Sequence, residues 1–193
     1  PDVPESIFMD GLKKLIDLDR EWVPKQEGSS LYIRPFMVAT DEYVGIRPSD
    51  SYAFIIFTCP VNSYYTEPLH VKIEEEYTRA AQGGTGYAKA AGNYAAQFYP
   101  TAQAMKKGYQ QIIWTDSSTH SYLEEAGTMN IFFRIEDKLI TAPIGDTILD
   151  GITRKSVIEW ARHQGITVEE RPVAITEIIE AAKSGTLKEI FGS

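Results

Sequence analysis

The chain has 193 residues, of which 43% are hydrophobic and 24% charged, so it is long enough for one packed core and a smaller accessory segment. Its 19 Lys and Arg residues against 27 Asp and Glu residues leave a net charge of −8, which repels phosphate backbones and makes nucleic acid a poor partner. The single cysteine, Cys59, excludes an internal disulfide, and the three histidines do not have the spacing of a zinc site, so no metal is expected.

The predicted elements begin with a helix and three strands. Apolar residues recur at helical spacing over 7–18, and Pro24 and Gly28 end that helix. Segments rich in β-branched and aromatic residues then predict strands at 31–39, 53–59 and 70–77. The longest apolar runs, such as 52–59, are far shorter than a membrane span, so we expect a soluble, cytoplasmic protein with no membrane partner.

Strands outnumber helices in the rest of the chain. A glycine-rich break at 82–86 is followed by a predicted helix over 92–107, in which Pro100 is a kink or a first-turn residue. Strands are predicted at 111–115, 130–135, 138–141, 166–173 and 187–191. Helices are predicted at 152–163 and 175–183. Because most strands follow one another without a helix between them, this order predicts an α+β fold rather than a parallel βαβ sheet.

Lys89 lies in a segment of mostly small residues that runs over 83–94. Few charged residues surround it, so we expect its ammonium group to be partly desolvated, which favours a nucleophilic amine. Such an amine suits Schiff-base chemistry with a carbonyl compound. On this segment alone, a surface lysine beside a flexible loop is the more common case. A Walker phosphate loop is a poor match, because Lys89 lies between two alanines.

Two further segments have the residue types of a binding site. Glu124 and Glu125 precede an apolar strand, and a carboxylate that enters a core needs a cationic partner such as a pyridinium nitrogen. Residues 149–154 form a turn that runs into a helix, whose free backbone N–H groups, with the Thr153 hydroxyl, form a potential anion site. Taken singly, solvated loop glutamates and an ordinary helix N-terminus are the favoured interpretations.

In this order and combination, the segments resemble the branched-chain amino acid aminotransferases, which are pyridoxal-phosphate enzymes of fold type IV. The resemblance covers nearly the whole chain and is carried by motifs at 15–17, 22–24, 30–35, 59–61, 92–94, 125–130, 151–154 and 191–193. It implies an α+β fold type IV large domain, with mostly antiparallel strands in a barrel-like arrangement and flanking helices. Members of the family are longer at both ends, so we expect an incomplete chain. Residues 1–28 would form a helix and an interdomain connection, and residues 29–193 part of the cofactor-binding large domain.

The resemblance implies pyridoxal 5'-phosphate as the cofactor. Lys89 matches the lysine that holds the cofactor as a Schiff base and then moves the proton of the substrate. Glu125 matches the carboxylate that faces the pyridine nitrogen and keeps it protonated. Tyr94 matches the tyrosine that forms a hydrogen bond with the phenolic oxygen of the cofactor.

Other cofactor contacts are implied by the same resemblance. Ile152 and Thr153 match the pair at a helix start that binds the phosphate. Thr128 matches a position that lines the cofactor and substrate side, and Arg79 matches a basic residue upstream of the lysine, with a supporting role. An arginine and a threonine that bind the phosphate in the family lie in segments without a counterpart here, so we expect weaker cofactor retention.

The implied reaction is transamination between branched-chain L-amino acids (leucine, isoleucine and valine) and 2-oxoglutarate in a ping-pong cycle. Tyr32 and Arg34 match a strand pair of the substrate pocket, where the arginine meets a substrate carboxylate. Tyr64 matches a further aromatic residue of that pocket. The expected partners are these small molecules and a second subunit in a homodimer. The alternatives are a D-amino acid aminotransferase or an aminodeoxychorismate lyase of the same fold type, or a non-catalytic fragment without cofactor.

Overall fold

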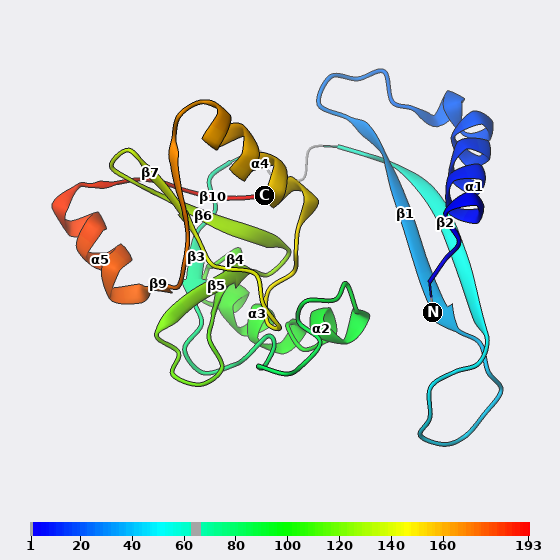
Figure 1. The fold of residues 1–193 in the computed structure, drawn as a ribbon, viewed down its shortest axis with the longest axis horizontal. Helices are drawn as coiled ribbons and strands as arrows, with labels where there is room; N and C mark the ends of the chain where they lie inside the picture. Colours follow the sequence, from blue (N-terminus) through cyan, green and yellow to red (C-terminus); the bar gives the residue numbers. More distant parts are fainter. Residues whose placement is uncertain (1, 63–66) are drawn as a thin grey trace. The chain divides into compact units, whose positions relative to one another are not determined.

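The computed structural model describes residues 2–62 and 67–193, so the predicted pocket residue Tyr64 lies outside the described residues. The chain forms two compact units, Pro1–Pro68 and Leu69–Ser193, which run from blue to cyan and from cyan-green to red in Figure 1. The sequence analysis places a boundary between residues 28 and 29, whereas the contacts divide the chain after residue 68. The physical reason is that the first helix packs on the strands that follow it.

The described residues of the first unit form two helices and a hairpin: α1 (Glu5–Leu18), the short 3-10 helix η1 (Arg20–Trp22), β1 (Ser30–Ala39) and β2 (Tyr52–Val61). The two strands pair antiparallel along their whole length, with Ser30 opposite Val61 at one end. α1 packs on one face of the hairpin, where the rings of Phe8 and Phe54 lie 5.5 Å apart. The predicted helix and the first two predicted strands are therefore confirmed.

The other face of the hairpin carries the two residues predicted to line a substrate pocket. Because side chains alternate along a strand, Tyr32, Arg34 and Phe36 of β1 lie on the same face. The guanidinium group of Arg34 lies 5.1 Å from the centre of the Tyr32 ring. Phe36 meets Phe57 of β2 edge to face, with their ring centres 5.9 Å apart. Tyr32 and Arg34 are thus neighbours on an exposed, largely aromatic surface.

The second unit is built on a mixed sheet. Its strands are β3 (Val71–Ile73), β4 (Gln111–Thr115), β5 (Tyr122–Ala126), β6 (Met129–Ile135), β7 (Lys138–Thr141), β8 (Thr167–Glu170), β9 (Val173–Ala174) and β10 (Leu187–Gly192). The pairing order is β3-β4-β5-β6-β7-β8, while β9 pairs with β5 and β10 with β6. The β3–β4 and β7–β8 pairs are parallel and the others are antiparallel. The predicted α+β class with mostly antiparallel strands is confirmed.

The helices described in the second unit are α2 (Ala91–Ala95), α3 (Phe98–Lys106), α4 (Ile152–His163) and α5 (Ile175–Ser184). α4 has the predicted bounds, and α5 extends one residue further than predicted. The single helix predicted over 92–107 is instead two helices. Pro100 lies in the first turn of α3, where a missing N–H costs no intrahelical hydrogen bond.

Three strand predictions need correction. The sequence predicts no strand at β5, because its Glu and Ala residues have low strand propensity and only its neighbours in the sheet make it a strand. β3 ends early, because the Glu74 carboxylate accepts hydrogen bonds from the N–H groups of Glu76 and Tyr77 and so forms a turn. The strand predicted at 166–173 is divided into β8 and β9, because Pro172 has no N–H for a ladder.

The centre of the sheet of the second unit, at β6, is buried on both faces. Phe133 packs with Ile178 of α5 on one face, and Phe132 packs with Ile158 of α4 on the other. The side chains of adjacent residues of β6 point to opposite faces of the sheet, because side chains alternate along a strand. This packing holds the β5–β6 hairpin and the start of α4, which form the pocket described below.

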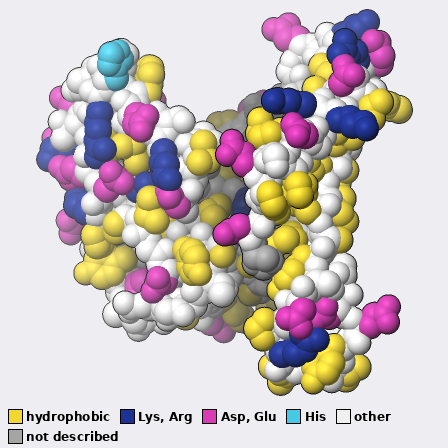
Figure 2. All heavy atoms as spheres, turned by 45° about the vertical axis from the view of Figure 1, so that its right-hand side comes forward, with side chains coloured by type: hydrophobic (Ala, Val, Ile, Leu, Met, Phe, Trp, Pro, Cys, Tyr) yellow, Lys and Arg dark blue, Asp and Glu magenta, His cyan; other side chains and the backbone are white. Residues whose placement is uncertain are grey.

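Acidic and basic side chains are interspersed over the face of the molecule that Figure 2 draws. The net charge of −8 is thus not gathered into one large acidic patch on that face. Among the described helices, none has the length and apolar character needed to cross a membrane.

Candidate functional site

The second unit contains a pocket of about 450 Å³. This volume lies within the range of about 300–1,000 Å³ that is typical of small-molecule sites. The pocket is lined by three segments that the sequence analysis singled out, together with the last residue: Lys89 and Tyr94; Glu125 and 127–130; 149–153; and Ser193. The structure therefore brings six predicted cofactor contacts together: Lys89, Tyr94, Glu125, Thr128, Ile152 and Thr153.

Lys89 lies in the loop that leads into α2. Asn93 holds this loop, since its side-chain amide donates to the carbonyl oxygens of Thr85 at 2.7 Å and Ala88 at 2.9 Å. Lys89 Nζ lies 5.2 Å from the centre of the Tyr94 ring. Contrary to the expectation of a desolvated amine, Lys89 is exposed. The expectation is wrong because the alanines and glycines around Lys89 have too little side chain to cover an ammonium group.

Glu125 is the buried acidic group of the pocket, with 4% of its surface exposed. Its Oε1 lies 2.7 Å from Arg79 Nη2, and its Oε2 accepts hydrogen bonds from Asn130 Nδ2 and from the backbone N–H of Leu149, both at 3.2 Å. Burial raises the pKa of Glu125 to about 7, although the Arg79 guanidinium acts in the opposite direction. A buried carboxyl of this kind pairs readily with a cation that enters the pocket.

Arg79 lies behind Glu125 rather than in the pocket wall. It is buried, and it also donates to the carbonyl oxygens of Thr147 at 2.7 Å and Gly86 at 3.4 Å. Arg79 therefore joins the Glu125 strand to the loop before Lys89 and to the loop before α4. The resemblance places Arg79 among the cofactor contacts with a supporting role, and in this structure Arg79 contacts Glu125 and does not line the pocket.

The first turn of α4 presents hydrogen-bond donors to the pocket. Gly151 is the N-cap residue, and no side chain caps this described helix. The N–H groups of Ile152 and Thr153 therefore have no acceptor within the helix, and the helix dipole adds partial positive charge at this end. The carboxylate of Asp150, which also lines the pocket, is paired with Lys155 at 2.5 Å in an exposed ion pair.

These groups fit pyridoxal phosphate, which carries an aldehyde, a ring nitrogen and a phosphate on one ring. An amine such as that of Lys89 condenses with an aldehyde, a buried carboxyl such as that of Glu125 pairs with a protonated ring nitrogen, and an uncapped helix start binds phosphate. The Ser193 hydroxyl adds one more donor, because its oxygen is buried without a hydrogen-bond partner among the described residues.

The residues predicted to contact the substrate are not among those that line this pocket. Tyr32 and Arg34 belong to the first unit, and Tyr64 lies outside the described residues. Their predicted role stays a prediction.

Asn130 is a pocket residue to which the sequence analysis gave no role. It stands directly opposite Glu125 in the β5–β6 hairpin, whose strands are joined by Gly127 and Thr128 alone. A two-residue connection that begins with Gly is a common hairpin turn. Had the hairpin been predicted from this turn, it would have placed Asn130 beside Glu125.

Comparison with known proteins identifies the family of the chain. Residues 1–191 match the family model of the class IV amino-transferases. The chain is 45% identical over 196 residues to the branched-chain-amino-acid aminotransferase 2 of Bacillus subtilis, with 100% of this chain and 54% of the relative covered. The chain thus spans about half the length of this curated relative.

Solved structures show the same fold. The branched-chain amino acid aminotransferase of Escherichia coli has a TM-score of 0.79 and 27% identity, over 100% of this chain and 61% of that chain. The branched-chain amino acid aminotransferase of Thermobaculum terrenum, solved in its PLP form, has a TM-score of 0.75 and 25% identity, over 99% of this chain and 60% of that chain.

Proposed function

Because the chain belongs to the class IV aminotransferases, we propose that it carries the cofactor site of a branched-chain-amino-acid transaminase. The amino group of leucine, isoleucine or valine would pass to 2-oxoglutarate in a ping-pong cycle. The observation that carries this proposal is the convergence of the Lys89 amine, the Glu125 carboxyl and the start of α4 on one pocket of about 450 Å³. The names of the relatives support the choice of substrate class.

Pyridoxal phosphate is the cofactor we propose for this pocket. When bound, it supplies an aldehyde for Schiff-base formation and a ring that withdraws electrons from the reacting carbon. Lys89 would bind the aldehyde carbon and, once released by the substrate amine, take the proton from the substrate α-carbon at its Nζ. The exposure of Lys89 leaves that nitrogen accessible to both.

Glu125 would hold a proton on the ring nitrogen of the cofactor. Its carboxyl is buried, so an ion pair formed there is screened little by water. Arg79 fixes Oε1 of the carboxylate from behind, which leaves the Glu125 side chain oriented before the cofactor binds. This pre-organisation strengthens the hold on a ring cation.

The opposite end of the cofactor would be held by α4. The N–H groups of Ile152 and Thr153 and the Thr153 hydroxyl are donors for the phosphate, in the positive field of the helix start. Tyr94 would donate to the phenolic oxygen from α2, and Thr128 would line the cofactor from the β5–β6 turn.

For the substrate side we propose Tyr32, Arg34 and Tyr64. The guanidinium group of Arg34 suits the side-chain carboxylate of 2-oxoglutarate, and the aromatic residues around it on the hairpin suit an apolar amino acid. We further propose a cytoplasmic homodimer, on the resemblance to fold type IV enzymes alone.

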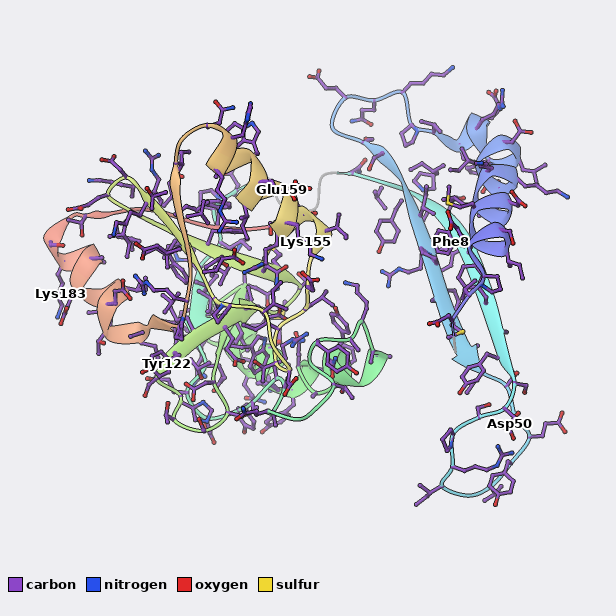
Figure 3. The ribbon with its side chains drawn as sticks, in the orientation of Figure 1. Phe8, Asp50, Tyr122, Lys155, Glu159 and Lys183 are labelled. Atoms are coloured by element: carbon purple, nitrogen blue, oxygen red, sulfur yellow. The ribbon has the colours of Figure 1, made fainter. Side chains whose placement is uncertain are left out.

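The test uses the purified full chain with pyridoxal phosphate, leucine and 2-oxoglutarate, and measures the glutamate formed. A second sample is incubated with pyridoxal phosphate and reduced with borohydride, which fixes the cofactor covalently on the lysine that holds it. Lys89→Ala should abolish both the formation of glutamate and the covalent label at this position. Lys183→Ala is the matched control, because Lys183 lies on α5 at the outer surface of the second unit and outside the pocket (Figure 3). It should retain both signals.

Other outcomes would assign the chain elsewhere. An active Lys89→Ala variant would overturn the role of Lys89. Activity with D-alanine and none with leucine would favour a D-amino acid aminotransferase. A colourless protein that takes up no pyridoxal phosphate would favour the non-catalytic alternative.

A further inference from the structure

Asn130 lies between the acidic end of the pocket and the loop that enters α4. It is buried, with 6% of its surface exposed. Its Nδ2 donates to Glu125 Oε2 at 3.2 Å and to the carbonyl oxygen of Leu149 at 2.9 Å. An amide nitrogen has two N–H hydrogens, so each can serve one of these two acceptors. One side chain therefore connects the carboxyl of Glu125 with the segment before the helix.

The segment before α4 is held in place by the same connection. The carbonyl of Leu149 also accepts from the N–H of Gly151 at 2.9 Å, and the N–H of Leu149 donates to Glu125 Oε2 at 3.2 Å. Gly151 is the residue from which α4 begins. The hydrogen bonds thus run without interruption from Glu125 to the N-cap of the helix.

The other side-chain atom of Asn130 lies against Gly151. A Cβ atom at Gly151 would collide with Asn130 Oδ1, so the absence of a side chain there permits the close approach. The backbone of Asn130 is fixed as well, because it exchanges hydrogen bonds with Ser193 at 3.2 and 2.9 Å. Asn130 has little freedom to move away from either partner.

We infer that Asn130 is a positioning residue that sets the separation between the Glu125 carboxyl and the first turn of α4. This inference rests on the proposed function, in which those two groups hold the ring nitrogen and the phosphate of one rigid cofactor. A rigid ligand with two fixed attachment points gains full affinity only where the two protein groups are held at the matching distance.

Arg79 does not duplicate this role. It contacts Oε1 of Glu125, whereas Asn130 contacts Oε2, and the loop contact of Arg79 is at Thr147, further from the helix start. Loss of Arg79 would disturb Glu125 and the two loops, but it would leave the bonds from Asn130 to Glu125 and Leu149 intact. Loss of Arg79 and loss of Asn130 should therefore affect binding of the cofactor in different ways.

The test measures dissociation constants of the full chain for three probes. The probes are pyridoxal phosphate, pyridoxal, which lacks the phosphate, and a pyridoxal phosphate analogue with CH in place of the ring nitrogen. The dissociation constant of each truncated probe is divided by that of pyridoxal phosphate. This ratio measures how much affinity the phosphate or the ring nitrogen contributes. A purely structural defect that leaves the pocket intact does not change these ratios.

The variants are Asn130→Ala and Asn130→Asp, with Glu125→Gln for comparison. Asn130→Asp keeps the size of the side chain but removes the N–H donors, so it serves if the alanine variant does not fold. Thr141→Val is the matched control: it removes a buried hydrogen bond from Thr141 Oγ1 to the carbonyl of Ile131, at 2.7 Å, outside the pocket.

Both Asn130 variants should weaken binding of pyridoxal phosphate by about tenfold or more, because Glu125 Oε2 and the Leu149 carbonyl each lose the donor that links them to one another. They should lower the contributions of both the phosphate and the ring nitrogen, whereas Glu125→Gln lowers that of the ring nitrogen alone and Thr141→Val lowers neither. An Asn130 variant that changes only one contribution, or neither, overturns the inference. The proposed function fails separately, if the unmodified chain does not bind pyridoxal phosphate at Lys89.

Discussion

Arg79 and Glu125 form an ion pair whose side chains are 1% and 5% exposed. Removal of one partner from such a pair leaves an uncompensated buried charge, which typically costs about 3–5 kcal/mol of stability. We therefore expect Arg79→Met to lower the free energy of unfolding by several kcal/mol, as measured by urea denaturation of the full chain at a pH above about 7, where Glu125 is ionised in the unmodified chain.

The matched control for Arg79→Met is Arg134→Met. Arg134 and Glu189 lie 3.9 Å apart with side chains 50% and 56% exposed. Exposed pairs contribute about 0–1 kcal/mol, so this control should unfold at nearly the same urea concentration as the unmodified chain. Equal losses in the two variants would contradict the special role assigned to the buried pair.

The pKa of Glu125 predicts a pH dependence of stability. Since burial raises it to about 7, above the ordinary value of 4.5, the folded chain binds this proton more tightly than the unfolded chain. The contribution of Glu125 to stability therefore falls as the pH rises from 4.5 to about 7. Without cofactor, the difference in the free energy of unfolding between Glu125→Gln and the unmodified chain should shift by about 2 kcal/mol in favour of Glu125→Gln as the pH rises from about 5 to 7.5.

Denaturation of both proteins at a series of pH values checks this prediction. A stability difference that stays constant over the range, or that changes in the opposite direction, would contradict the raised pKa. The experiment is done without pyridoxal phosphate, because a cation beside the carboxyl would lower its pKa.

Most residues of the pocket could be recognised from the sequence, but their surroundings could not. Lys89, Glu125 and Thr153 stand in motifs, and motifs are local. The burial of Arg79 depends on a loop distant in the chain, that of Thr147, which no local pattern reports. The environment expected for Lys89 was wrong for a different reason, because the small residues around it leave its amine exposed.

Among the elements, α4 offers a direct test of the phosphate site. On binding of pyridoxal phosphate, we expect the amides of residues 152–154 to exchange hydrogen about tenfold more slowly. An amide that donates to the phosphate can exchange with water only after the ligand has dissociated. Hydrogen exchange measured by mass spectrometry or NMR reports this change.

α5 is the control helix for the exchange experiment. It also begins without a side-chain cap, but its first turn does not line the pocket. Its first-turn amides should exchange at the same rate with and without pyridoxal phosphate. Uniform protection of both helices, or of neither, would argue against phosphate binding at α4.

The elements that sequence predicted best are those with an unambiguous pattern. β4 has an apolar centre and is buried throughout, and α4 is an amphipathic segment that follows Gly151. β5 has neither property, since its two glutamates interrupt the pattern and its strand form depends on pairing with β4, β6 and β9. The missed strand is also the one that carries Glu125, so the hairpin that brings Asn130 to the site was missed with it.

At the scale of the whole chain, the described pocket belongs entirely to the second unit. A ligand that binds the folded state stabilises it by about 2.7 kcal/mol at a free concentration of 100 times its dissociation constant. We therefore expect pyridoxal phosphate to raise the Tm of the full chain by several degrees in calorimetry. Pyridoxal at the same concentration should raise it less, because it lacks the phosphate that α4 would hold.

Surface lysines are the main source of error in this measurement, since any exposed amine can react with an aldehyde. Lys183→Ala removes one such lysine and should keep the whole shift in Tm, whereas Lys89→Ala should lose most of it. If Lys89→Ala kept the shift, the stabilisation would come from scattered surface reactions and the assignment of the pocket would fail. If pyridoxal raised the Tm as much as pyridoxal phosphate, Lys89 could still be the attachment point, but the first turn of α4 would not be the phosphate site.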